Sequence, residues 1–432
     1  MIRLLALAAL FGMAAGAQTE SQLNTNERIL RIREMAKRNA AAAIPALTPY
    51  LTDPDRDIRV EVVKAFVKLD TERSLDPLVQ ATRDSDGEVQ IRATDGLVNY
   101  YIPGYVAKSG LTGSLTRGVR QVKSFFASRN DQVVDPDVVV RPDVAQALSD
   151  EVKRDTSTDA RANAALASGI LRNRVAVESL ESSLHSRNSE LIFECLVALQ
   201  KIGDVSAGPG VSFLAHDLDP RIQITALQTI GLLRSLTSAP DVRSALKDAR
   251  TIKVRRAALD SLAMLGLGED RPVFLQYLND RDAELRSAGL EGLGRIREPE
   301  DTPALQAAFD EPDADWRVHM AAAFALVSEG KVDTSEFSPL PYLFENVKAN
   351  DRSKVASAYL TELARREDVR RTLVSMLPSA TKEQKLAMCS MLGDGRDPDA
   401  IPVLQKLSND VDPDVALAAS RSLRIAQTRR AQ

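Results

Sequence analysis

The chain has 432 residues, more than one ordinary compact core contains, so either several domains or an array of repeats is expected. Apolar residues make up 44% of the chain and aromatic residues only 4%, so any core must consist mainly of Leu, Ala, Val and Ile. The formal net charge of -4 provides no overall positive field, and we therefore expect no nucleic-acid partner.

Residues 1–17 have the pattern of a secretory signal peptide. Arg3 supplies the positive start, residues 4–15 are apolar, and Ala15-Gly16-Ala17 is a small-residue cleavage signal. We expect a periplasmic or secreted protein that begins near Gln18; the alternative is an N-terminal helix that is retained. No later window approaches the roughly 20 apolar residues that a membrane-spanning helix needs, so no stable membrane span is predicted.

The first helix expected in the mature chain covers Thr25 to Arg38. Ile29, Ile32 and Met35 lie on one side of it, and arginines lie on the other. A repeat array usually begins with a capping helix whose outer face is polar. We assign residues 24–99 to this cap and the first repeats. A basic helix lying on a membrane surface is the alternative.

An internal repeat dominates the rest of the sequence. Anchor residues, most of them apolar, recur at spacings of about 29 to 32 residues, apart from one large and one smaller insertion. The anchors are Ile58, Val89, Ala160, Leu191, Ile222, Val254, Leu285, Trp316, Val355, Gln384 and Val415. Small or apolar residues four, five and eight positions after most anchors predict one buried face of an α-helix.

Each repeat also carries signals for the start of this helix and for an earlier one. Residues suited to helix capping lie three positions before the anchors: Asp55, Asp86, Ser157, Asn188, Asp219, Thr251, Asp282, Asp313, Thr381 and Asp412. Earlier helices, often opened by Pro, are predicted at Pro45–Leu51, Val177–Leu184, Pro240–Leu246, Pro272–Leu278, Pro303–Phe309 and Pro402–Leu407. We predict an all-α, right-handed α-solenoid of about eleven helical hairpins.

One inserted segment, residues 100–142, separates the first repeats from the array at residues 143–427, and residues 428–432 form a tail. It contains Tyr100, Tyr101, Tyr105, Phe125 and Phe126, which are many aromatic residues for this chain. The segment is expected either to contact a partner or to fold back onto the end of the solenoid.

The repeat resembles a known family. Runs such as Asp217-Leu218-Asp219-Pro220, Val254-Arg255 and Leu293-Gly294 are similar to the short HEAT-like repeats of the phycobilisome lyases, which belong to the armadillo-like α-solenoids. The resemblance covers roughly residues 42–98 and 143–427. It implies the fold, but it does not imply one function, because scaffolds, chaperones and a few enzymes share this repeat.

The enzymes of this repeat class are poor models for the chain. Deoxyhypusine hydroxylases bind iron through His-Glu dipeptides, whereas the histidines here, His185, His216 and His319, are followed by Ser, Asp and Met. A phycobilin lyase would need a pigment-bearing partner, which export disfavours. No phosphate-binding loop or nucleophile motif is present, and we predict no catalytic residues, no cofactor and no metal.

Two recurring charged features have a structural and a functional interpretation. The Asp-x-Asp pairs, such as Asp53/Asp55, are predicted to cap helices; calcium binding is the alternative, but the turn glycine and distal Glu of a calcium loop are missing. Arginines after the anchors are expected to reach carboxylates of neighbouring turns, with a ligand-binding row as the alternative. These arginines are Arg59, Arg161, Arg255, Arg286 and Arg317.

These observations favour a non-catalytic scaffold or adaptor that binds protein partners in the periplasm or cell envelope. We expect the second helices of the hairpins to line the binding surface. Helical spacing gives as contact residues Glu61, Lys64, Arg92, Asp95, Gln228, Asp260 and Glu291, in addition to the five aromatic residues of the insertion. The alternative is a metal- or ligand-dependent enzyme or module with its site in residues 100–142.

Overall fold

The computed structural model describes residues 24–37, 39–108, 132–154, 157–394 and 399–431. These residues form helices, turns and loops, with no strand among them. The chain divides into two compact units: unit 1 contains residues 1–134 and 138–207, and unit 2 contains residues 135–137 and 208–432. No helix within the described ranges has the length and apolar character needed to cross a membrane.

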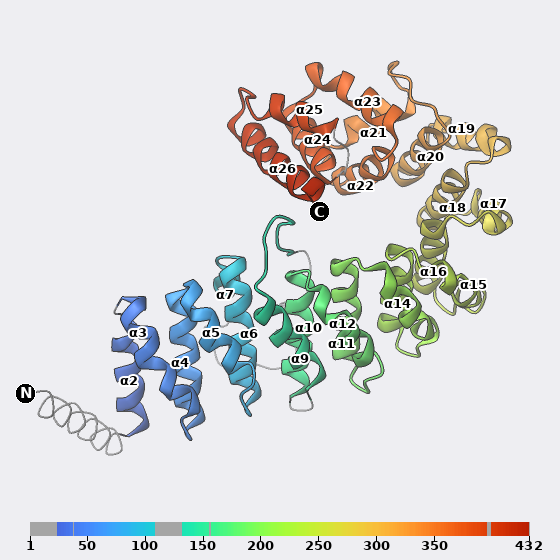
Figure 1. Cartoon of the computed structure of the whole chain (residues 1–432). Coiled ribbons are helices and arrows are strands. Elements are labelled where there is room, and N and C mark those ends of the chain that lie inside the picture. Colours follow the sequence, from blue (N-terminus) through green and yellow to red (C-terminus); the bar gives the residue numbers. More distant parts are fainter. Residues whose placement is uncertain (1–23, 38, 109–131, 155–156, 395–398, 432) are drawn as a thin grey trace, which may run out of the picture. The chain divides into compact units, whose positions relative to one another are not determined.

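The described part of the chain contains eleven helical hairpins, as predicted, and the second helix of each packs on the next second helix of its unit (Figure 1). In unit 1 these second helices are α4 (Arg56–Leu69), α6 (Gly87–Tyr101), α10 (Thr158–Ile170) and α12 (Ser189–Ile202). In unit 2 they are α14 (Pro220–Leu232), α16 (Ile252–Leu265), α18 (Ala283–Ile296), α20 (Trp316–Ser328), α22 (Ser353–Leu363), α24 (Lys382–Asp394) and α26 (Pro413–Ala431).

The first helices are shorter, and a 3-10 turn adjoins several of them. In unit 1 they are α3 (Ala40–Leu47) with η1 (Thr48–Thr52), η2 (Glu72–Ser74) with α5 (Leu75–Ala81), α9 (Pro142–Lys153), and η3 (Arg174–Ala176) with α11 (Val177–Ser183). The later ones are η4 (Val205–Ala207) with α13 (Gly208–Val211) and η5 (Ser212–His216), η6 (Leu236–Ser238) with α15 (Ala239–Lys247), η7 (Gly268–Asp270) with α17 (Arg271–Tyr277), η8 (Pro299–Asp301) with α19 (Thr302–Asp310), α21 (Pro339–Asn346), α23 (Glu367–Met376) with η9 (Leu377–Ser379), and α25 (Ala400–Leu407).

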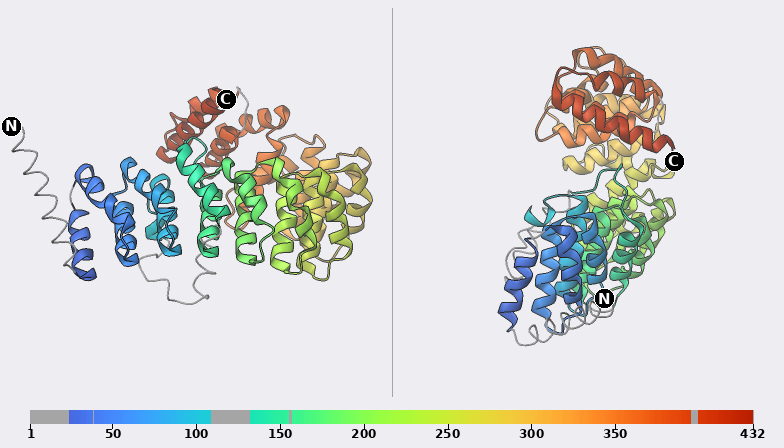
Figure 2. Two further views of the ribbon diagram at one scale, coloured as in Figure 1. Left: turned by 60° about the horizontal axis from the view of Figure 1, so that its bottom comes forward. Right: turned by 60° about the vertical axis from the view of Figure 1, so that its left-hand side comes forward.

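Two further helices belong to unit 1: α2 (Thr25–Met35), which packs on α4, and α7 (Tyr105–Lys108), which packs on α6. On α2, Arg28 and Arg33 bind Asp53 and Glu61, so this basic helix forms the first layer of the solenoid. Figure 2 shows the unit 1 helices, coloured blue to green, standing side by side in chain order.

The first helices begin slightly earlier than the prolines predicted. Pro240, Pro272 and Pro303 each occupy the second position of their helix, where the missing N–H has no intrahelical acceptor to lose. Pro45 lies well inside α3, because Asn39 caps that helix by accepting the N–H of Ala41 at 2.8 Å.

Capping and burial confirm the predicted register of the second helices, with one correction. Asp313 was the predicted cap of the eighth repeat, but Asp315 caps α20 by accepting the N–H of Arg317 at 2.9 Å. The first fully buried residue of this helix is therefore Val318, and Trp316 stays partly exposed. Two aspartates could cap this helix. Because α19 has 9 residues where α17 has 7, the cap moves two residues along the chain to Asp315.

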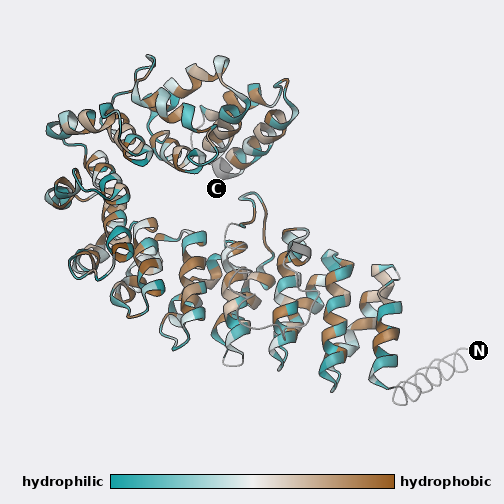
Figure 3. Cartoon of the chain, turned by 180° about the vertical axis from the view of Figure 1, so that it is seen from behind, coloured by the Kyte–Doolittle hydropathy of each residue, from teal (hydrophilic) through white to brown (hydrophobic). Residues whose placement is uncertain are grey.

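The apolar faces of these helices form the core of each unit. Almost all the large core residues are aliphatic, as the aromatic-poor composition required, and Phe66, Phe274 and Phe324 are among the exceptions. Each helix therefore carries both hydrophobic and hydrophilic surface, seen as brown and teal in Figure 3. A single hairpin could not bury such a face alone, so stacking is what stabilises the array.

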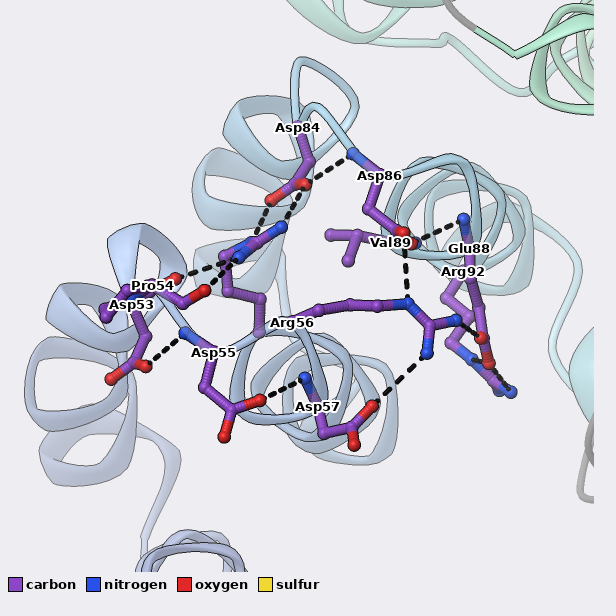
Figure 4. Close-up of polar contacts among 11 residues, drawn as sticks. Asp53, Pro54, Asp55, Arg56, Asp57, Asp84, Asp86, Glu88, Val89 and Arg92 are labelled. Carbon is purple, nitrogen blue, oxygen red and sulfur yellow. Dashed lines mark hydrogen bonds and ion pairs between the residues drawn. The ribbon is translucent and has the colours of Figure 1, made fainter. Parts of the chain in front are cut away.

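Basic side chains join several repeats to the acidic turn of the next. Arg59 of α4 makes two hydrogen bonds, of 2.7 and 3.0 Å, to the carboxylate of Asp84 (Figure 4). Arg56 binds Asp86 at 3.0 Å and also Glu88. The two bonds from Arg59 leave little rotational freedom, so they fix the angle between neighbouring turns as well as contributing energy.

The predicted arginine ladder is confirmed at Arg59 and at Arg286, which binds Glu311 of the following turn. Two other members behave differently. Arg161 donates to the backbone carbonyl of Val152 at 2.8 Å, and Arg317 binds the carboxylate that caps its own helix.

Candidate partner-binding surface

The contact residues predicted on the second helices fall into two groups. Four of them lie on adjacent helices of unit 1: Glu61 and Lys64 on α4, and Arg92 and Asp95 on α6. The other three lie on successive helices of unit 2: Gln228 on α14, Asp260 on α16 and Glu291 on α18. Each group lies on one face because its members share the same repeat positions, three and six residues after the anchor.

The unit 1 group lines a groove of about 560 Å³ between α2, α4, α6 and α7. We call it the α2–α6 groove; its lining is Arg33, Glu61, Lys64, Val67, Lys68, Asp70, Arg92, Asp95, Asn99, Gly104 and Val106. A smaller hollow of about 380 Å³ between α2 and α4 adjoins it and shares four of these residues. The larger volume falls within the range of ligand-binding clefts in proteins.

Ion pairs hold the floor of this groove. Glu61 accepts two hydrogen bonds from Arg33, at 2.7 and 3.3 Å, and Lys64 lies 3.6 Å from the same carboxylate. Burial of Glu61 disfavours its ionised form, but the bond from Arg33 and the charge of Lys64 outweigh that effect, so its pKa is lowered. Glu61 is therefore ionised at neutral pH and anchors both cations.

The other two predicted contact residues of unit 1, Asp95 and Arg92, also bond within the fold. Asp95 is 2% exposed and accepts a hydrogen bond from Asn163 at 3.2 Å. Arg92 binds Glu88 one turn earlier on α6, at 2.7 Å. In contrast, the side chains of Arg33 and Lys64 are 56% and 45% exposed, so the groove presents cations to the solvent.

In unit 2 the corresponding face is crossed by a network of internal bonds. Glu291 accepts hydrogen bonds from Arg295 at 3.0 Å and from the Tyr359 hydroxyl at 2.5 Å. Arg295 makes two further bonds of 3.0 Å to Glu362, which also binds Arg234 at 3.1 Å. Side chains of α18, of α22 and of the turn after α14 are thus tied together, although these elements are far apart in sequence.

Aromatic stacking reinforces this network. The Arg295 guanidinium lies 4.7 Å from the centre of the Phe324 ring, and that ring stacks on Tyr359 at 4.7 Å. Burial, together with the nearby charge of Glu291, raises the pKa of the partly buried Asp260 to about 8. Of the three predicted contact residues in unit 2, Gln228 alone is fully exposed.

The described aromatic residues of the insertion pack on unit 1. Tyr105 is 1% exposed and belongs to the core, and Tyr100 and Tyr101 pack against that core with their rings edge to face. The hydroxyl of Tyr101 accepts the backbone N–H of Arg141, just before α9, at 3.0 Å. These three tyrosines support the folded-back interpretation of their part of the insertion. The predicted contacts Phe125 and Phe126 lie outside the described residues.

The Asp-x-Asp turns use their carboxylates for capping. Asp53 accepts the backbone N–H of Asp55 at 2.9 Å, and Asp55 accepts that of Asp57 at 2.9 Å (Figure 4). The first bond recurs at 2.8 to 3.0 Å in the pairs Asp84/Asp86, Asp217/Asp219, Asp280/Asp282 and Asp410/Asp412. Within the described residues, no group of three or more His, Cys, Asp or Glu side chains is placed to hold a metal ion.

Comparison with known proteins agrees with this architecture. The family model for HEAT repeats matches residues 16–98, 251–327 and 271–373. The chain is an α-solenoid of HEAT-like repeats. No curated protein sequence matches it.

Two solved structures match the chain at 17% sequence identity. One is a crystal structure of an engineered protein, for which the match covers 89% of this chain and 98% of that one with a TM-score of 0.39. The other is the complex of CpcE and CpcF of phycocyanin lyase from Nostoc sp. PCC7120, with 61% and 90% covered and a TM-score of 0.35.

Sequence reasoning missed several residues of these HEAT-like surfaces. Lys68 and Arg295 both lie ten positions after their anchors, one turn beyond the positions we had selected, and that spacing could have identified them. No spacing pattern could identify Tyr359 and Glu362. Tyr359 binds Glu291 across 68 residues of sequence, and Glu362 binds Arg295 across 67.

Proposed function

We propose that this HEAT-like protein is a non-catalytic scaffold that binds a protein partner in the α2–α6 groove. The observation that carries the proposal is the groove itself, in which Glu61, Lys64, Arg92 and Asp95 from two adjacent repeats line one cleft. We further propose that it works in the periplasm or cell envelope, a location that rests only on the signal pattern of residues 1–17.

The groove suits binding because its framework is rigid and its lining is accessible. The Arg59–Asp84 and Arg33–Glu61 bonds fix α2, α4 and α6 relative to one another, which reduces the entropy lost when a partner binds. The lining combines charged side chains with the apolar Val67, so it offers both contact area and directional bonds.

Unit 2 is the weaker candidate, because most of its polar groups on the corresponding face already bind one another. A partner that used Glu291 would have to displace Arg295 and Tyr359 and leave them unpaired. We therefore assign the primary contact to unit 1.

The proposal can be tested by placing a photo-crosslinking amino acid at Lys64 in the mature chain. Lys153 on the first-helix side is a matched control, since both lysine side chains are 45% exposed and each pairs with a glutamate. We expect one discrete product with envelope extract at position 64 and none at position 153. Equal labelling at both positions, or none at either, would count against binding in the groove.

Export has its own test. Sequencing the N-terminus of protein from the periplasmic or secreted fraction should give a chain that starts at Gln18. Recovery of the full-length chain from the cytoplasm alone would contradict the location and leave the groove proposal standing.

A further inference from the structure

Four cations lie in and beside the α2–α6 groove: Arg33 on α2, Lys37 two residues past the end of that helix at Met35, and Lys64 and Lys68 on α4. Lys64 and Lys68 are four residues apart, so they share one helix face and lie about 6 Å apart along the axis. Like charges at this spacing repel, although the helix dipole favours a cation in the last turn, where Arg33 and Lys68 lie.

The carboxylates in reach do not balance these cations. Glu61 is shared between Arg33 at 2.7 Å and Lys64 at 3.6 Å. Lys37 binds Glu34 at 2.6 Å, but both side chains are more than 60% exposed, and such surface pairs are weak. Lys68 is exposed and makes no ion pair within the described part of the chain.

The other acids of the lining do not neutralise the surplus. Asp95 is buried and accepts a hydrogen bond from Asn163, so its carboxylate does not face the exposed cations. Asp70 is exposed at the end of α4, where its backbone forms the left-handed C-cap with a φ of 45°. The four solvent-facing cations therefore stand against three acids in reach: the exposed Glu34 and Asp70, and Glu61, which Arg33 and Lys64 share.

We propose that the α2–α6 groove recognises an extended acidic segment of the partner protein. An extended chain rises about 3.3 Å per residue, so carboxylates two residues apart would match the roughly 6 Å spacing of Lys64 and Lys68. Val67 and Val106 give the intervening side chains apolar contact. This proposal rests on the proposed function and specifies the chemistry of its partner.

The test is binding of a fluorescein-labelled octapeptide of alternating Glu and Ala to the mature chain, measured by fluorescence anisotropy. The groove variant is Lys64→Glu with Lys68→Glu. The control is Lys153→Glu with Arg174→Glu, two exposed residues on the first-helix side that change the net charge equally. We expect about a tenfold loss of affinity in the groove variant, less than about twofold in the control, and weaker binding as salt rises.

Three results would overturn the proposal. Equal losses of affinity in the two variants would show a nonspecific charge effect. Equal binding of the matching Gln-Ala peptide would show that the groove does not recognise carboxylates. Stronger competition by polyphosphate than by the unlabelled Glu-Ala peptide would indicate a general polyanion site. If the peptide fails to bind but the crosslinker at Lys64 still captures a partner, the proposal of an acidic partner segment is wrong and the scaffold function stands. If both fail, the scaffold function fails as well.

Discussion

The second-helix faces of unit 1 and unit 2 use the same repeat positions in opposite ways. In unit 1, Lys64 projects into an open groove, and its one carboxylate partner lies 3.6 Å away. In unit 2, Glu291 occupies the equivalent position and is held by Arg295 and Tyr359. A charged residue at this position is thus no sign of a binding surface by itself; its role depends on which repeats face one another.

Removing the centre of the unit 2 network should have the largest effect. Arg295→Met should cost about 3 kcal/mol, because Glu291 and Glu362 would lose their shared cation in a largely buried site. Hydrogen exchange followed by mass spectrometry should show faster exchange in peptides of α18 and α22.

The matched change in unit 1 is Arg33→Met. The Arg33 side chain is 56% exposed, against 11% for Arg295, so the cost should stay below about 1 kcal/mol. Equal destabilisation by the two substitutions would remove the proposed contrast between an internal network and an open groove.

The second prediction concerns a buried acid of unit 1 that makes no ion pair among the described residues, with Arg154 as a nearby charge only. Glu151 is 1% exposed, accepts a hydrogen bond from Thr94 at 2.7 Å, and has a pKa that burial raises to about 8. Its folded-state pKa thus exceeds its unfolded value of about 4.3, so the folded chain binds the proton more tightly and stability falls as pH rises between these values. We expect Glu151→Gln to flatten this loss and to stabilise the protein at pH 8 by about 2 kcal/mol.

Chemical denaturation of wild type and Glu151→Gln at pH 5, 6.5 and 8 would measure this difference. At pH 5 the gap should shrink to about 1 kcal/mol, because the unfolded carboxyl has only begun to ionise above its pKa of about 4.3. A difference between them that does not change with pH would show that Glu151 is ionised in the folded protein, as Glu362 is beside Arg295.

The third prediction concerns close helix packing in unit 2. A Cβ on Gly294 would lie 2.4 Å from the Cα of Ala325, so α18 and α20 would have to separate. Gly294→Ala should therefore destabilise by about 1.5 kcal/mol net, after the gain in helix propensity is counted.

Gly268→Ala is the control, since nothing lies within 4 Å of its Cβ position. Gly169→Ala tests the same packing in unit 1, where the added atom would lie 2.7 Å from the Cα of Ala198. Thermal melts of the three variants should rank Gly268→Ala as the most stable. A Gly294→Ala protein as stable as the wild type would show that the helices move apart freely.

Much of the fold could be predicted because its signals are local. Asp86 caps α6 by accepting the N–H of Glu88 at 2.9 Å, and Val89, three residues after the cap, is fully buried, as the spacing required. The same logic failed at Asp313, because Asp315 stands two residues away and offers an equal cap. Spacing cannot choose between two adequate caps; the greater length of α19 does.

The candidate surfaces were predictable only in part. Helical spacing correctly placed Glu61, Lys64, Arg92 and Asp95 on one face, since side chains three residues apart on a helix are neighbours and corresponding positions of adjacent repeats align. It could not reveal that Asp95 is buried against Asn163, 68 residues later, or that Tyr105 lies in the core.

The sequence by itself determined the hairpins, their caps and their apolar faces, because each depends on residues within about one repeat of each other. Tertiary structure alone decided which charged positions stay open. Glu362 binds Arg295 across 67 residues and Arg234 across 128, and no periodic pattern encodes those pairings. They arise because stacking brings distant repeats together in unit 2, while in unit 1 the same stacking leaves Lys64 and Lys68 facing an open groove.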